Sequence, residues 1–164
     1  MQRVTKVAAM PLALLAAGCA STVRVPDSLK PSANESLALV AAATGAQIYE
    51  CRDSKWLFVA PEAELWDARG RKIGSHYAGP HWELADGSKV LATVKARADA
   101  PAAGAIPWLL LNAKSVGAEG AFSKVTSIQR VATHGGVAPA GGCSQSGEEA
   151  RVYYTADYYF FTAK

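Results

Sequence analysis

The chain has 164 residues, half of them hydrophobic, and 17 basic against 14 acidic residues give it a formal charge of +3. This length suits one domain with a substantial core and leaves no room for a large second domain. Two of the basic residues, Arg3 and Lys6, lie in a segment that we expect to be removed, which lowers the charge to near +1. A balance this close to neutral argues against a nucleic-acid partner.

Residues 1–18 are typical of an export signal. Arg3 and Lys6 precede an apolar run over 7–17, which is too short for a membrane-spanning helix because such a helix needs about 20 residues. Small residues end the run immediately before Cys19, and this resembles the bacterial lipobox, in which the cysteine becomes acylated. The alternative is an ordinary secretory signal that happens to end near a cysteine.

Lipidation of Cys19 would attach the protein to a membrane through its N-terminal lipid. Each buried CH₂ group of an acyl chain contributes about 0.8 kcal/mol, so several chains anchor firmly. Ala20 follows the cysteine in place of Asp, and by resemblance to lipoprotein sorting signals this favours the outer membrane of a bacterial cell envelope, facing the periplasm. Residues 19–36, rich in Ser and Pro, are expected to form a flexible tether, with the folded domain over 37–164.

The two remaining cysteines, Cys51 and Cys143, form an even pair. In an oxidising compartment such a pair predicts a disulfide. Closing a loop of roughly 90 residues would stabilise the fold by about 4–5 kcal/mol in the chain-entropy model. The alternative is two free thiols, one of them reactive.

From residue 37 onwards the pattern is that of β-strands. The run 37–43 fits helix or strand, and its short length favours strand. Asp86-Gly87 is the strongest hairpin signal in the chain, and Gly79-Pro80 marks another turn. The first half is expected to contain further short strands, bounded by turns at 52–54 and 68–70, over 46–51, 55–60, 62–67, 71–77 and 81–84.

The second half continues in the same way. Residues 90–97 alternate apolar and polar, which predicts a strand with one buried face. The other expected strands, separated by a loop over 98–105 and a Gly-rich loop over 135–149, are 106–111, 122–133 and 151–162. Eight to ten short strands of this kind predict an all-β fold, a single antiparallel β-sandwich or barrel-like domain.

Several motifs occur together along the chain. They are Gln47-Ile48-Tyr49 with Cys51, His76-Tyr77-Ala78-Gly79-Pro80 with Trp82, Asp86-Gly87-Ser88, Ile106-Pro107-Trp108, Ile128-Gln129-Arg130-Val131, Cys143, and Tyr154 to Phe160. In this order they resemble the DUF3455 family, uncharacterised exported proteins of bacteria and fungi. The likeness covers about residues 36–161 and implies no established activity, so it indicates no cofactor.

Histidines are the candidates for metal chemistry. His76, His81 and His134, with nearby carboxylates, offer the nitrogen and oxygen ligands that zinc prefers. However, His76 and His81 are five residues apart, which on one strand points them to opposite faces unless Gly79-Pro80 bends the chain. The sequence also lacks H-E-x-x-H, C-x-x-C and G-x-S-x-G motifs. We therefore expect no metal and no cofactor, and keep an envelope hydrolase or metalloenzyme at these histidines as the alternative function.

Aromatic residues favour a binding role instead. Tryptophans and the tyrosines of the last strand could line a cleft for a glycan or a small apolar ligand, although most would form the core of a small β domain. On the last strand, alternation places Tyr154 and Tyr158 on one face and Asp157 on the other, wetter one. The candidate binding residues are His76, Trp82, Asp86, Trp108, Arg130 and Asp157.

Arg130 and Asp157 lie on two strands that could be neighbours. In that case a charge-assisted hydrogen bond between them is expected to close one end of the sheet. The alternative for Arg130 is a clamp for a ligand carboxylate. Together these patterns predict a non-enzymatic ligand-binding or structural module of the cell envelope, and they name no partner protein.

Overall fold

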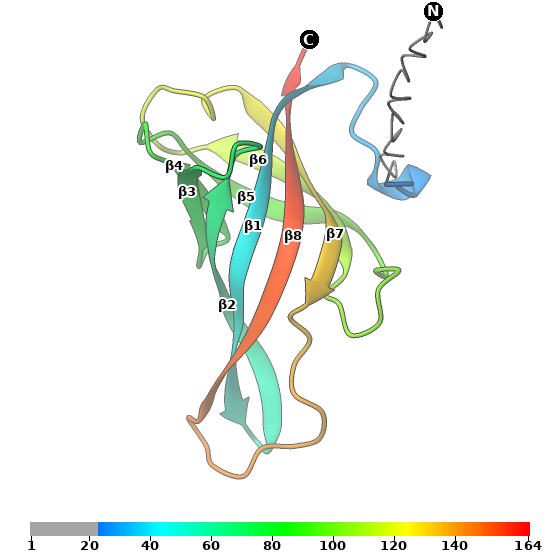
Figure 1. The fold of residues 1–164 in the computed structure, drawn as a ribbon, viewed down its shortest axis with the longest axis vertical. Helices are drawn as coiled ribbons and strands as arrows, with labels where there is room; N and C mark the ends of the chain where they lie inside the picture. Colours follow the sequence, from blue (N-terminus) through cyan, green and yellow to red (C-terminus); the bar gives the residue numbers. More distant parts are fainter. Residues whose placement is uncertain (1–22) are drawn as a thin grey trace, which may run out of the picture.

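The computed structural model describes residues 23–164, so the predicted export signal, the predicted lipidation site at Cys19 and the first residues of the expected tether lie outside the described residues. A short 3-10 helix and eight strands follow one another along the chain (Figure 1). They are η1 (Asp27–Leu29), β1 (Glu35–Arg52), β2 (Lys55–Trp66), β3 (Lys72–Tyr77), β4 (His81–Leu84), β5 (Lys89–Ala98), β6 (Trp108–Ser115), β7 (Val125–Gly135) and β8 (Glu149–Ala163).

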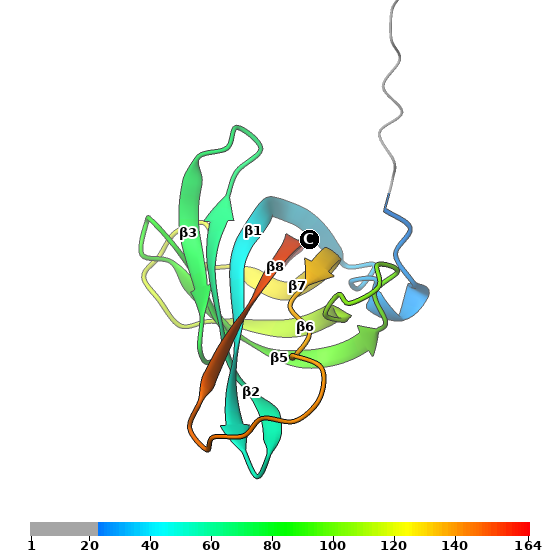
Figure 2. The same cartoon turned by 60° about the horizontal axis from the view of Figure 1, so that its bottom comes forward.

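The strands form a closed barrel in which each pairs with the next in sequence. All pairs are antiparallel, and the ring closes where β1 pairs with β8 along nearly their whole lengths, from Glu35 opposite Ala163 to Glu50 opposite Glu149. In Figure 2, β1 and β8 lie next to each other in the part of the ring that faces the viewer. The prediction of an all-β antiparallel domain is confirmed, and the β1–β8 pairing decides for a barrel over a sandwich.

Strands β1 and β2 are longer than predicted. The run 37–43 is a strand, as favoured, but it continues through 46–51 as β1, and 55–60 continues through 62–67 as β2. The predicted break in β1 at Gly45 was wrong because this residue makes no turn. Gly45 is extended and packed against β2, where an added Cβ would lie 2.1 Å from the Glu62 carbonyl oxygen. The register of this pair shifts between Ile48 and Tyr49, where Val59 of β2 is the extra residue of a bulge.

The predicted hairpin turns are confirmed. Asp53 and Ser54 connect β1 to β2 with φ of 51° and 60°, the positive values that a two-residue hairpin requires. Asp86-Gly87 connects β4 to β5, and the Gly79-Pro80 peptide, which is cis, lies in the β3–β4 turn. β7 begins at Val125, three residues later than the 122–133 prediction, because 122–124 form a turn.

The inner face of the barrel holds the main core. Tyr154, Tyr158 and Phe160 point inward from β8, and all three are fully buried. Phe122, from the β6–β7 connection, packs against Phe160 with ring centroids 4.5 Å apart and fills the end of the barrel that lies near the C-terminus. This end is therefore closed by side chains.

A second, smaller core lies on the outer face. Leu29 of η1 is fully buried against Trp108, Leu110 and Val131. The Gln129 side-chain amide donates a 2.6 Å hydrogen bond to the Leu29 carbonyl and holds this segment in place. The expected flexible tether over 19–36 therefore overlaps the domain, because its residues from about Val25 onwards pack on the barrel. Residues 25–163 contain the closed ring and its two cores, so this part of the chain has the hydrophobic core that a unit folding on its own requires.

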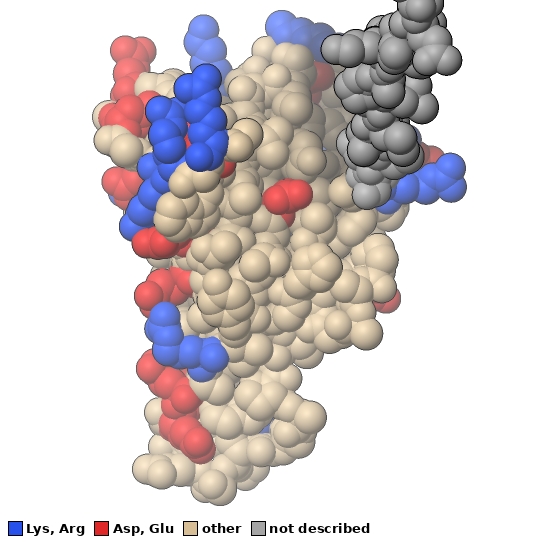
Figure 3. All heavy atoms as spheres, in the orientation of Figure 1, with Lys and Arg blue, Asp and Glu red and all other residues tan. Residues whose placement is uncertain are grey.

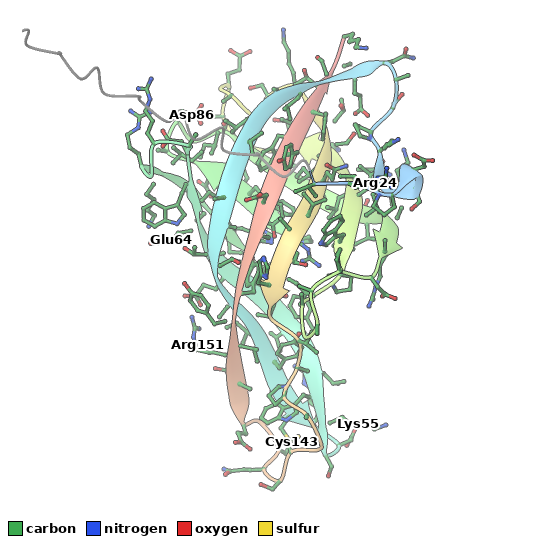
Figure 4. The ribbon with its side chains drawn as sticks, turned by 45° about the vertical axis from the view of Figure 1, so that its right-hand side comes forward. Arg24, Lys55, Glu64, Asp86, Cys143 and Arg151 are labelled. Carbon is green, nitrogen blue, oxygen red and sulfur yellow. A yellow bond between two sulfur atoms is a disulfide. The ribbon has the colours of Figure 1, made fainter. Side chains whose placement is uncertain are left out.

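Cys51 and Cys143 form the predicted disulfide, with Cα atoms 5.7 Å apart. Figure 4 places Cys143 near Lys55, at the tip of the β1–β2 hairpin, far from Asp86 at the other end of the barrel. The bond ties the long β7–β8 connection to this hairpin. Within this connection, the Cys143 backbone amide donates a 3.2 Å hydrogen bond to the Ser54 carbonyl oxygen of the hairpin.

Charged side chains gather along the side of the barrel that carries β2 and β3, while the face over β1, β8 and β7 is largely uncharged (Figure 3). Ion pairs on the charged side include Arg151 with Glu62 at 2.9 Å and Lys72 with Glu64 at 2.6 Å. All these partners are well exposed, and such surface pairs contribute little to stability. Among the described residues, no helix has the length and apolar character needed to cross a membrane.

Candidate ligand-binding cavity

The barrel encloses a cavity of about 930 Å³. In an up-and-down barrel alternate connections lie at the same end, so the β1–β2, β3–β4, β5–β6 and β7–β8 connections share one end. The cavity opens between them, since its lining includes Phe58, Pro80, residues 99–105 and Val137. Eight-stranded barrels are just wide enough to hold one small ligand, and their mouths are common binding sites.

The mouth is lined by apolar side chains that solvent reaches. The exposed fractions are 54% for Phe58, 44% for Val59, 59% for Val94 and 46% for Val137. Val94 lies on the inward-facing side of β5, as the alternation predicts, and is exposed because the cavity beside it is open. The described part of the chain leaves these side chains uncovered, and a ligand in the cavity would cover them.

Aromatic rings form the deeper wall. The His76 ring stacks on Trp82 with centroids 4.0 Å apart, and Tyr158 meets both rings edge-on at 5.3 and 5.4 Å. Burial lowers the pKa of His76 to about 3, so the ring is neutral at any physiological pH. Its Nδ1 lies 2.7 Å from the His81 carbonyl oxygen and therefore carries the proton, which leaves Nε2 as an acceptor.

Arg130 brings a positive charge to the cavity from β7. It lies opposite Tyr158 in the β7–β8 register and, like Tyr158, lines the cavity. Its Nε and Nη2 donate to the Pro107 carbonyl oxygen at 3.1 and 2.8 Å. The same charge disfavours protonation of His76, although burial is the larger cause of the low His76 pKa. The side chain is half-buried and held in one place.

Two further donors in the lining lack acceptors. Trp82 Nε1 and Gln47 Nε2 are buried, and neither has a hydrogen-bond partner among the described residues. The Gln47 amide lies near the Tyr154 hydroxyl without the geometry of a hydrogen bond. Because an unpaired buried donor costs about 1–3 kcal/mol, such groups are rare in stable folds and point to an absent partner.

Gly136 shapes the wall beside Gln47. It has φ of 82°, and an added Cβ would lie 2.9 Å from Tyr154 Cβ and 3.0 Å from Ile106 Cγ2. Its carbonyl oxygen accepts a 2.6 Å hydrogen bond from the Tyr49 hydroxyl. Burial raises the pKa of Tyr49, so this hydroxyl keeps its proton and the bond. The start of the β7–β8 connection is thus fixed against β1.

The structure brings three of the predicted site residues together, His76, Trp82 and Arg130, all in the cavity lining. The other three lie elsewhere. Trp108 packs under Leu29 on the outer face. Asp157 is half-buried opposite Val131, where burial raises its carboxyl pKa. Asp86 belongs to a turn at the closed end of the barrel (Figure 4).

The predicted ion pair between Arg130 and Asp157 is wrong. Their strands are neighbours, as the prediction required, but the two residues lie on opposite faces of the sheet. Arg130 is paired with inward-facing Tyr158, whereas Asp157 is the next residue along β8 and points outward. The guanidinium bonds the Pro107 carbonyl instead.

The three histidines do not meet. His76 points into the barrel, while His81 stacks on Tyr77 on the outer face, with centroids 5.4 Å apart. The bend at Gly79-Pro80 places them on adjacent strands but leaves them on opposite faces, since His76 pairs with Trp82 and His81 with Tyr77. His134 is exposed near the end of β7. Within residues 23–164 no group of His, Cys, Asp and Glu is arranged to hold a metal ion.

Asp86 closes the far end of the barrel. Its carboxylate accepts from the amide and hydroxyl of Ser88, at 2.9 and 2.6 Å, and from the Ala121 amide at 2.9 Å. The Ser88 hydroxyl in turn accepts from the Phe122 amide at 3.1 Å. These bonds hold the segment that inserts Phe122 into the barrel, which is a structural role.

Several cavity residues were not among the predicted binding residues. Gln47 and Tyr49 follow Ala41, Ala43 and Gly45 at alternate positions of β1, so alternation alone placed a long amide on the inward face. That was a usable signal. Phe58, Val94 and Val137 come from three separate segments, and only the closed ring brings them to one mouth.

The geometry defines a class: a closed, eight-stranded antiparallel barrel with one sealed end and an open, mainly apolar cavity, with Arg130 half-buried in its wall and Arg97 exposed at its mouth. The chain belongs to the DUF3455 family of proteins of unknown function, whose model matches residues 31–162. Comparisons with curated proteins and with solved structures find no match.

Proposed function

We propose that this protein is a non-enzymatic binding module whose barrel takes up one small, largely apolar molecule. This proposal rests on the open cavity of about 930 Å³, whose mouth is lined by the exposed side chains of Phe58, Val59, Val94 and Val137. That volume lies at the upper end of the range of about 300–1,000 Å³ typical of small-molecule sites. Covering a Val or Phe side chain completely is worth about 1.5–3 kcal/mol, so a ligand that shields these four gains substantial affinity.

The lining favours an apolar ligand over a glycan. Sugar sites need many paired donors and acceptors, whereas this wall is built mainly from aliphatic and aromatic carbon with few polar groups. An envelope hydrolase or metalloenzyme at His76, His81 and His134 is not proposed, because these side chains lie on different faces of the barrel.

The proposal also includes the location. Acylation of Cys19 would hold the domain on the periplasmic side of a bacterial outer membrane, and it is supported by the lipobox-like end of the apolar run and by Ala20. Metabolic labelling with a palmitate analogue tests this: the wild-type chain should be labelled and Cys19→Ser should not. Equal labelling of both chains, or of neither, would remove the anchor from the proposal.

Binding is tested on residues 23–164 with the neutral fluorescent probe N-phenyl-1-naphthylamine, whose emission rises on entering an apolar site. We expect saturable binding of one probe per barrel. The informative variant is Val94→Lys, which puts a charge in the mouth and should weaken binding at least about tenfold, because it replaces apolar contacts worth about 1.5 kcal/mol or more.

Val116→Lys is the matched control. Val116 is also an exposed valine, at 47% against 59% for Val94, but it lies outside the cavity lining. It should bind the probe like the wild type. Absence of saturable binding, or an equal loss in both variants, would refute the proposed function.

A further inference from the structure

Arg130 is the one group in the deep wall of the cavity that carries a full charge. A guanidinium has five N–H groups and no acceptor. Two of them are used by the Pro107 carbonyl oxygen, through Nε and Nη2. Three N–H groups remain for another partner, including both on Nη1.

No acidic side chain of residues 23–164 lies within ion-pair distance of this charge. In the described part of the chain the ion pairs involve other cations, and none includes Arg130. Residues 1–22 contain neither Asp nor Glu, so they cannot supply the missing carboxylate either. The other charged residues of the lining, Arg97 and Asp99, are exposed at the mouth. A half-buried guanidinium with free N–H groups in a mainly apolar wall offers a binding position to an anionic partner.

The neighbouring polar groups are also hydrogen-bond donors, so they favour a negatively charged partner as well. Trp82 Nε1 and Gln47 Nε2 are donors without acceptors in the same cavity. Trp82 contacts Tyr158, which in turn lies opposite Arg130, so indole and guanidinium belong to one group of side chains. A carboxylate offers two oxygens with about four lone pairs and can accept from several such donors at once.

Building on the cavity function proposed above, we propose that the natural ligand is an amphipathic carboxylate, an apolar chain or ring system ending in a single carboxyl group that Arg130 binds inside the barrel. The apolar part lies toward the mouth, against Phe58 and Val94. The carboxylate accepts from the free N–H groups of Arg130, including both on Nη1. A cationic head group is excluded from this position by the arginine, and a neutral one leaves its charge unpaired.

The experiment compares three ligands that share one apolar chain: dodecanoate, dodecan-1-ol and dodecylamine. Each displaces N-phenyl-1-naphthylamine from residues 23–164 at pH 8 and below its micelle concentration. We expect dodecanoate to bind at least about tenfold more tightly than the alcohol, because a hydrogen bond to a charged group corresponds to about a factor of ten or more. The amine should bind most weakly.

Arg130→Gln should abolish the preference for carboxylate over alcohol while leaving alcohol binding within about threefold, since it removes the charge but keeps a polar side chain. Arg130→Lys keeps the charge and loses the planar fork, so we expect an intermediate preference. Arg69→Gln is the matched control: it removes the same charge from the exposed β2–β3 turn, outside the cavity lining, where water and salt screen it, and the preference should change by less than about twofold.

The outcomes separate the two proposals. If no ligand displaces the probe and the probe itself does not bind, the cavity function fails. If all three ligands bind equally, or folded Arg130→Gln keeps the carboxylate preference, the cavity function stands and the carboxylate assignment is overturned. If Arg130→Gln does not fold, the order of the three ligands on the wild-type chain decides.

Discussion

Reduction of the Cys51–Cys143 disulfide should destabilise the barrel strongly. The bond joins residues 92 apart in sequence, and in the chain-entropy model a loop of this length stabilises the fold by about 4–5 kcal/mol. That is a large share of the 5–15 kcal/mol typical of a whole domain. The native structure should survive reduction, because Cys51 also exchanges backbone hydrogen bonds with Gly147 and Glu148 at 2.9 and 2.8 Å.

Urea unfolding with and without dithiothreitol, followed by tryptophan fluorescence, measures this effect. With a slope of about 2 kcal/mol per molar urea, a loss of 4–5 kcal/mol lowers the midpoint by about 2 M. The slope itself should rise on reduction, because the unfolded chain without its cross-link exposes more surface. The double variant Cys51→Ala, Cys143→Ala is the control and should not respond to the reductant.

The disulfide also borders the cavity, since the connection it ties down contributes Val137 to the mouth. Reduced protein that remains folded should therefore bind the naphthylamine probe more weakly than oxidised protein. A midpoint that does not move on reduction, or one that moves equally in the double variant, would refute the entropic argument.

Two further predictions concern stability. Ala132 has φ of 49°, a left-handed backbone value that costs an alanine about 1–2 kcal/mol. Ala132→Gly should therefore raise the melting temperature by about 1–4 °C. The control Ala113→Gly, in β6 where the backbone is regular, should lower the melting temperature. Hydrogen bonds from Ser88 and Ala121 lower the pKa of Asp86 below its ordinary 3.8. Its stabilising contribution is therefore complete above about pH 4 and lost as the pH falls through the folded-state pKa. The urea midpoint of Asp86→Asn should lie below that of the wild type at pH 7, and the gap should shrink at pH 2.5; a gap independent of pH would contradict this role.

Part of this structure follows from local sequence. Alternating residues at 90–97 and the two-residue turns at 53–54 and 86–87 are set by contacts within a few positions, so the strands around them were predictable. The disulfide was predictable as well, because Cys51 and Cys143 are the two cysteines within the predicted domain 37–164. The inward positions of Gln47, His76 and Trp82 follow the same alternation.

What the tertiary structure decided depends on partners far apart in sequence. Closure of the ring pairs β1 with β8 across more than a hundred residues, and no local pattern distinguishes that pairing from a sandwich. The orientation of the Arg130 side chain also depends on strand pairing. Its charge suggested Asp157, but the β7–β8 register directs the two side chains to opposite faces and leaves the guanidinium inside the barrel. Sequence alone therefore determined the turns and the existence of most strands, because these depend on local geometry, and counting the cysteines predicted their pairing. It did not determine the lengths of β1 and β2. The cavity and its unpaired charge arise only when the closed ring sets which side chains face one another.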